Sequence, residues 1–97
     1  MTRFVFYTQA KRDINEAIAW YDRRGDGLGD RFQQALEKAL SKLEQNPFGY
    51  TRVYGPWRRI LLAKFPYRVV YRIAGDTIYV AACIHGRRHP KHWRRRL

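Results

Sequence analysis

The sequence predicts an α+β fold, a two-layer sandwich in which a helix hairpin packs on an antiparallel sheet. Two observations carry this prediction. Apolar residues recur at helical spacing through the first half of the chain, and strand-like alternation replaces that spacing from residue 50 onwards. The length of 97 residues, with 45% hydrophobic and 15% aromatic side chains, suits one domain spanning residues 1–97.

The first half of the chain predicts one strand and two helices. Residues 3–7 have β-forming side chains, although the sequence leaves open which strand they pair with. Thr8 can cap a first helix over residues 8–24, and a second helix over residues 28–45 ends before Pro47. The second helix has the clearest apolar stripe in the chain, formed by Leu28, Phe32, Ala35, Leu36, Ala39, Leu40 and Leu43. The short Gly-rich connection predicts an antiparallel hairpin.

The second half predicts three consecutive strands over residues 58–65, 67–73 and 77–84, separated by Pro66 and by an Ala-Gly-Asp turn. The expected order of elements is therefore β-α-α-β-β-β. Since side chains alternate along a strand, Arg68 and Arg72 lie on the face opposite Val69 and Tyr71, and Arg58 or Arg59 joins them. On the last strand one apolar face is expected from Ile78, Val80, Ala82 and Ile84.

The charge is concentrated in this second half. The chain has 20 Lys and Arg against 8 Asp and Glu, a net charge of +12. Residues 50–97 contain twelve of the basic residues and a single acidic one, Asp76. A field of one sign attracts nucleic acid or an acidic protein partner, whereas a merely solubilising surface intersperses both signs.

The single cysteine, Cys83, excludes an internal disulfide and any zinc site with several cysteines, and its apolar neighbours predict a buried side chain. The N-terminal residues have no signal-peptide core, and no apolar run has membrane-spanning length. We therefore expect a cytoplasmic protein without a membrane partner.

Short motifs recur along nearly the whole chain, in order Ala10, Asp13-Ile14, Trp20-Tyr21, Gly27-Leu28-Gly29, Phe32, Leu40, Leu43, Asn46-Pro47, Arg58-Arg59, Phe65 to Tyr71, Ala82, His85, Arg88, Pro90 and Trp93. In this order and spacing they resemble the RelE/ParE family of bacterial toxins, and specifically its ParE-like branch. The resemblance implies the order of elements given above and a type II toxin–antitoxin system. In such a system a cognate antitoxin holds the toxin inactive in a hetero-oligomer.

The resemblance leaves two mechanisms open. ParE-like members inhibit DNA gyrase without established catalytic residues, and RelE-like members cleave mRNA in the ribosome. Cleavage by 2′-hydroxyl attack needs a base, an acid and cations. The candidates here are Arg59, Arg72 and His85, but Asp76 lies in a turn and no tyrosine follows Tyr79. We therefore favour gyrase inhibition without intrinsic catalysis, with mRNA cleavage on the ribosome as the alternative.

Two binding surfaces are expected. The target-binding surface comprises Arg87, Arg88, Trp93, Arg94 and Arg95, and the antitoxin-binding surface comprises Arg58, Arg59, Arg68 and Arg72. Since the strands end near Ile84, the tail after His89 is expected to be dispensable for the folded core. His85, His89 and His92 lack a carboxylate nearby and Pro90 interrupts their spacing, so we expect no metal and no cofactor.

Overall fold

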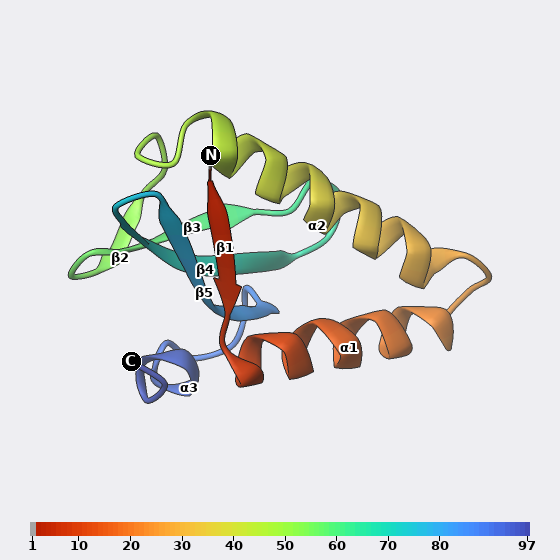
Figure 1. Cartoon of the computed structure of the whole chain (residues 1–97). Coiled ribbons are helices and arrows are strands. Elements are labelled where there is room, and N and C mark those ends of the chain that lie inside the picture. Colours follow the sequence, from red (N-terminus) through yellow and green to blue (C-terminus); the bar gives the residue numbers. More distant parts are fainter. Residues whose placement is uncertain (1) are drawn as a thin grey trace.

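The computed structural model describes residues 2–97, and its central feature is a five-stranded sheet with helices on both faces (Figure 1). Helices α1 and α2 form a hairpin on one face, and the short α3 packs against the other. The elements in chain order are β1 (Arg3–Phe6), α1 (Thr8–Asp22), α2 (Leu28–Gln45), β2 (Arg52–Tyr54), β3 (Trp57–Leu61), β4 (Tyr67–Ala74), β5 (Thr77–His85) and α3 (Lys91–Arg94).

The strand order is β1-β5-β4-β3-β2, and the sheet is mixed. Strands β2 to β5 form the expected antiparallel meander, whereas β1 pairs with β5 in parallel, from Arg3 opposite Thr77 to Phe6 opposite Val80. The α+β class and the helix hairpin are confirmed, and the sheet differs from a wholly antiparallel one at this pair. Parallel neighbours cannot be joined by a tight turn and need a long connection. The elements between β1 and β5 in the chain provide that connection.

The core between the helix hairpin and the sheet contains the predicted stripe of α2. Phe32, Leu36, Ala39 and Leu43 are buried, and the remaining stripe residues are half-buried. Phe32 also stacks on Tyr21 of α1, with 5.5 Å between ring centroids, and contacts Phe65 and Tyr67 edge-on. Aromatic side chains bury a large apolar area each, so this cluster joins the hairpin to the start of β4.

A β-bulge in β5 changes which side chains face the helices. Val70 lies opposite Ala82 and Tyr71 lies opposite Val80, so Ala81 has no partner of its own in β4. One extra residue reverses the alternation that follows it. Ile78, Val80 and Cys83 therefore belong to the core under the helices, and Ala82 and Ile84 belong to the opposite face. The prediction that Ile78, Val80, Ala82 and Ile84 share one face was wrong for this reason.

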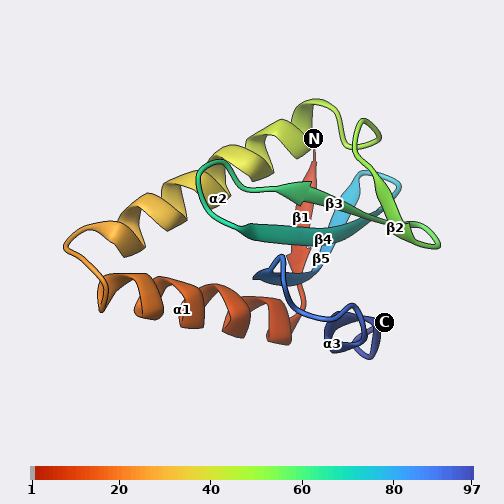
Figure 2. The ribbon, with the colours of Figure 1, turned by 180° about the vertical axis from the view of Figure 1, so that it is seen from behind.

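A second, smaller core covers the outer face of the sheet, away from the helix hairpin. Trp93 of α3 is only 1% exposed and packs with Trp57, Val70, Ala82 and Ile84. The chain end thus folds back over the sheet, and Figure 2 shows α3 on the side opposite α2. The expectation that the tail is dispensable was wrong, because a buried tryptophan contributes a large apolar area to a domain of this size.

Some details of the elements differ from the sequence analysis. The strand expected over residues 58–65 ends at Leu61, and a turn follows in which Lys64 has φ 68°. The short strand β2 was not predicted. Thr8 is the first residue of α1 and makes no capping hydrogen bond, since Tyr7 occupies the N-cap position. Within residues 2–97, no helix combines the length and the apolar character needed to cross a bilayer.

Candidate basic surfaces and polar cleft

The outer face of the sheet carries the expected arginines. Arg59 lies opposite Val70, and Arg72 lies opposite Tyr79, on the face away from the helix hairpin. The guanidinium of Arg72 lies 6.0 Å from the ring centroids of both Trp57 and Tyr79. Flat aromatic neighbours hold such a guanidinium in place and leave its charge available.

Arg68 lies on the same face, and its Nη2 donates a hydrogen bond of 2.7 Å to the carbonyl of Gly86. This bond fixes the segment that follows β5 against the start of β4. Arg68 therefore has a structural contact in addition to its position on the basic face.

Arg58 lies on the other face. It is opposite Tyr71, and its Nη1 donates to the carbonyl oxygens of Tyr50 at 2.7 Å and Phe48 at 3.2 Å. These bonds hold the loop that follows α2 against the sheet. Of the two neighbouring arginines that the sequence left open, the structure places Arg59 on the outer face and gives Arg58 a structural role.

His85 is separated from Arg59 and Arg72 by the sheet itself. It lies opposite Tyr67, whose ring packs with the core under the helices, and the two ring centroids are 5.5 Å apart. Its Nδ1 accepts a hydrogen bond of 3.1 Å from the backbone N–H of Arg87. The bulge at Ala81 causes this placement, because uninterrupted alternation would put His85 on the arginine face.

His85 instead lines a polar cleft of about 320 Å³ between α1 and the end of β5. Asp13, Glu16, Tyr67 and Arg88 line the same cleft. Burial raises the pKa of the Tyr67 hydroxyl, the nearby Tyr21, Cys83 and Asp13 raise it further, and Arg88 opposes them. The sequence analysis missed Asp13 and Glu16 here because it looked for carboxylates only after residue 49. Their separation of three residues on α1 was the available signal, since it puts both on one helix face.

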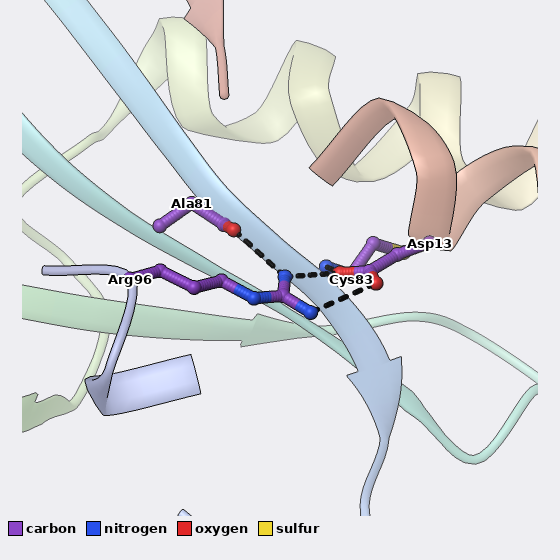
Figure 3. Close-up of polar contacts among 4 residues, drawn as sticks. All are labelled: Asp13, Ala81, Cys83 and Arg96. Atoms are coloured by element: carbon purple, nitrogen blue, oxygen red, sulfur yellow. Dashed lines mark hydrogen bonds and ion pairs between the residues drawn. The ribbon is translucent and has the colours of Figure 1, made fainter. Parts of the chain in front are cut away.

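Asp13 is engaged by an ion pair with Arg96, which joins α1 to the last residues of the chain (Figure 3). Nη1 and Nη2 of Arg96 contact the two carboxylate oxygens at 2.5 and 3.0 Å, and both side chains are 13% exposed. The same two residues also bond to the backbone of β5. Asp13 accepts a hydrogen bond of 3.0 Å from the N–H of Cys83, and Arg96 donates one of 3.0 Å to the carbonyl of Ala81.

This pair protects an unpaired part of the sheet edge. The pairing of β1 with β5 ends at Val80, so the backbone of Ala81 and Cys83 lies beyond the last residue of β1. An exposed strand edge presents donors and acceptors that invite unwanted pairing. Asp13 and Arg96 form hydrogen bonds with the N–H of Cys83 and the carbonyl of Ala81, and at the same time they hold the tail in place.

The C-terminal segment presents the other predicted basic surface. Arg87, Arg88, Arg94 and Arg95 are exposed, and the guanidinium of Arg94 lies 4.6 Å from the ring centroid of Tyr54. Trp93 is buried, so it supports these arginines from beneath and offers almost no surface to a partner. Within residues 2–97, His85, His89 and His92 do not gather with each other or with carboxylates into a group that could hold a metal ion.

Comparisons with known proteins agree with this architecture. The sequence model for the ParE toxin of the type II toxin–antitoxin system parDE matches residues 4–90. The chain belongs to the ParE toxin family. The toxin named ParE2 of Mycobacterium tuberculosis is 27% identical over 79 residues, which cover 80% of this chain and 75% of that protein.

Solved structures share the fold of this ParE-family chain at low sequence identity. A chain from the chromosomal ParDE toxin–antitoxin system of P. aeruginosa superposes with a TM-score of 0.75 at 18% identity, covering 88% of this chain and 96% of that one. The isolated RelE toxin of E. coli gives a TM-score of 0.56, also at 18% identity, covering 95% and 92%. The fold is therefore that of RelE and ParE toxins.

Proposed function

We propose that this ParE-family toxin inhibits DNA gyrase in the cytoplasm by binding it, without chemistry of its own, and that a cognate antitoxin neutralises it in a hetero-oligomer. One observation supports this mechanism above others: Arg59 and Arg72 lie on one face of the sheet and His85 lies on the other. General acid–base catalysis needs its groups within hydrogen-bonding reach of one substrate. These three residues do not meet that condition.

The gyrase-binding surface in this proposal consists of the exposed Arg87, Arg88, Arg94 and Arg95, positioned by the buried Trp93. Arginine forks suit carboxylate and phosphate partners, both of which a DNA-bound enzyme offers. Because the family match ends at residue 90, the contribution of Arg94 and Arg95 rests on the structure of α3 and not on the family.

A matched pair of variants tests this surface. Arg94→Ala/Arg95→Ala removes two exposed cations from the tail, and Arg23→Ala/Arg24→Ala removes two exposed cations at the end of α1. The wild-type toxin and the α1 variant should inhibit supercoiling by purified gyrase equally well. The tail variant should inhibit it roughly tenfold more weakly, as expected when contacts worth about 1.4 kcal/mol are lost. Equal inhibition by the two variants would rule out the tail surface.

A second candidate function is cleavage of mRNA on the ribosome, and the polar cleft favours it. Glu16 and His85 both line that cleft together with Arg88, which supplies the carboxylate, imidazole and cation that such a reaction uses. Cleavage sites mapped in cells that express the wild type, and abolished by both Glu16→Gln and His85→Gln, would establish this function in place of gyrase inhibition.

Neutralisation is tested separately from the target. The open reading frame next to the toxin gene should encode a protein that restores growth when it is co-expressed. Absence of any neutralising neighbour would remove the antitoxin from the proposal.

A further inference from the structure

Three buried side-chain atoms within residues 2–97 have no hydrogen-bond partner, and all three lie on the outer face of the sheet. They are Nε of Arg68, Nε of Arg72 and Nε1 of Trp93. Each of them is an N–H donor. A buried donor without an acceptor costs free energy, and a folded protein keeps few such groups. The outer face therefore has more donors than acceptors, an imbalance that an anionic partner corrects.

The cations of this face are not balanced by carboxylates. Arg59 of β3 and Arg72 of β4 make no ion pair with any carboxylate of residues 2–97. The five strands and α3 contain no aspartate or glutamate, and Asp76 lies in the turn between β4 and β5. Arg94 and Arg95 of the tail add further exposed cations beside this face, on which α3 packs (Figure 2). A surface of one sign attracts a polyanion.

Arg72 is already positioned for such a partner. Its guanidinium lies 6.0 Å from the ring centroids of both Trp57 and Tyr79, and its Nε is buried. Because the side chain is half-buried between these rings, it loses little further hydration and little rotamer freedom when an anion binds. A planar guanidinium in a fixed position suits a bidentate contact with a phosphate.

Arg59 is placed for a second contact of the same kind. It lies opposite Val70, and Arg72 lies two residues further along β4, so the two arginines are diagonal neighbours on adjacent strands. Diagonal neighbours in a sheet are separated by about 7–8 Å. A nucleic-acid strand carries its phosphates at a close and regular spacing. Arg59 and Arg72 can therefore contact neighbouring phosphates of one strand.

The aromatic rings of this face are not available to unstacked bases. Trp57 and Trp93 are 5% and 1% exposed, and Tyr79 is half-buried. The guanidinium of Arg94 lies over the exposed ring of Tyr54, 4.6 Å from its centroid. Sites for single strands stack bases on exposed aromatic side chains, and protein interfaces have an apolar centre. Among the described residues, the centre of this face offers neither, which favours the phosphates of a duplex.

We propose that the outer face of the sheet binds duplex DNA through its backbone, with Arg59 and Arg72 on neighbouring phosphates. The toxin then contacts the DNA segment that gyrase holds as well as gyrase itself, and this second statement rests on the proposed function. Contacts to phosphates position a protein on DNA without reading the sequence of bases. The two surfaces adjoin, because α3 packs on the outer face and carries Arg94.

Fluorescence anisotropy of a labelled duplex, titrated with the full-length toxin, measures this binding. A protein with a net charge of +12 attracts any DNA, so a matched pair of variants is needed to locate the site. Arg59→Gln/Arg72→Gln removes two cations from the outer face, and Arg23→Gln/Arg31→Gln removes two exposed cations from the helix hairpin. The outer-face variant should bind at least about tenfold more weakly than the hairpin variant. Its plot of log affinity against log salt should be shallower by about 1.8, since two phosphate contacts are lost.

Amide chemical shifts of the isotope-labelled wild type give a measurement that does not depend on any variant folding. Addition of the duplex should shift the amide signals of Arg59, Arg72 and their neighbours on β3 and β4, and leave those of α2 unchanged. Shifts confined to the helix hairpin would contradict the inference.

The titrations also distinguish duplex DNA from other polyanions. An equal loss of affinity in the two variants would show attraction to the total charge alone and would overturn the inference. Tighter binding of single-stranded RNA than of the duplex, weakened by the outer-face variant, would replace the DNA site with an RNA site. Binding of polyglutamate that the duplex does not displace would assign the face to an acidic protein.

Inhibition of gyrase separates this inference from the function on which it rests. The outer-face variant should inhibit supercoiling about tenfold more weakly than the hairpin variant. If the wild type does not inhibit gyrase at any dose, the gyrase proposal fails, and the titrations of the toxin alone still decide whether the outer face binds DNA. If the wild type inhibits gyrase and the outer-face variant inhibits it equally well, the gyrase function stands and the DNA contact is wrong.

Discussion

Replacing Asp13 with alanine should destabilise the whole domain, although Asp13 lies outside the apolar core. The substitution removes a two-point ion pair with Arg96 in which both side chains are 13% exposed, and leaves the N–H of Cys83 without its acceptor. Breaking a fully buried pair costs about 3–5 kcal/mol, and an unsatisfied buried donor costs about 1–3 kcal/mol. Since the pair is partly solvated, we expect a total loss of about 3 kcal/mol of unfolding free energy.

Urea denaturation, followed by tryptophan fluorescence, measures this loss. A double-mutant cycle with Arg96→Ala should give a coupling energy of about 1–3 kcal/mol, because the two residues act as one unit. Glu16→Ala is the control, since Glu16 is an exposed carboxylate one turn later on α1 and should cost less than about 0.5 kcal/mol. Single variants within about 0.5 kcal/mol of the wild type, or strict additivity in the cycle, would refute the role given to this pair.

Three further predictions concern the core. Leu36→Ala, at a position 5% exposed under the helix hairpin, should cost about 2–5 kcal/mol in thermal or urea unfolding, and an unchanged stability would contradict the packing of α2. Burial raises the pKa of Tyr71 from 10.0 to about 12, so the folded state disfavours the ionised phenol. The contribution of Tyr71 to stability should therefore be constant below pH 10 and be lost as the pH rises from 10 to 12, and Tyr71→Phe should flatten that part of the fall; a parallel decline in both proteins would assign it to other groups. Burial also raises the pKa of the Cys83 thiol to about 12, so a thiol reagent at pH 8 should label Cys83 only after denaturation, and rapid labelling of the native protein would show that the core opens easily.

Local signals were enough to predict the helices. The stripe of α2 has seven apolar positions at helical spacing, and the structure buries Phe32, Leu36, Ala39 and Leu43 as that spacing requires. The glycines between the helices enforce the hairpin, with Gly27 in the left-handed conformation at φ 76°. These features depend on residues close together in the sequence, which is why a single sequence contains them.

Long-range contacts were not predictable in this way. The bulge at Ala81 depends on how β4 and β5 fit together, and neither strand carries a glycine or proline that marks it. Asp13 and Arg96 are 83 positions apart, and nothing local to either residue indicates the other.

The candidate site, too, was predicted where local alternation decides a residue's position and missed where a long-range contact does. Alternation correctly placed Arg68 and Arg72 on one face of β4, because the extra residue of the bulge lies in β5 and the alternation along β4 is unbroken. The position of His85 depends on the bulge four residues earlier, and one extra residue moves its imidazole across the sheet. Which residues surround His85 therefore depends on a feature that the sequence does not reveal.

Inhibition of purified gyrase tests the central proposal most directly. The wild-type protein should block supercoiling of relaxed plasmid in a dose-dependent manner, and His85→Gln should inhibit equally well, because binding does not need a proton carrier. In parallel, translating ribosomes should show no mRNA cuts that depend on the protein. Gyrase that keeps full activity at every dose, together with ribosome-dependent cuts that disappear on His85→Gln, would contradict the proposal.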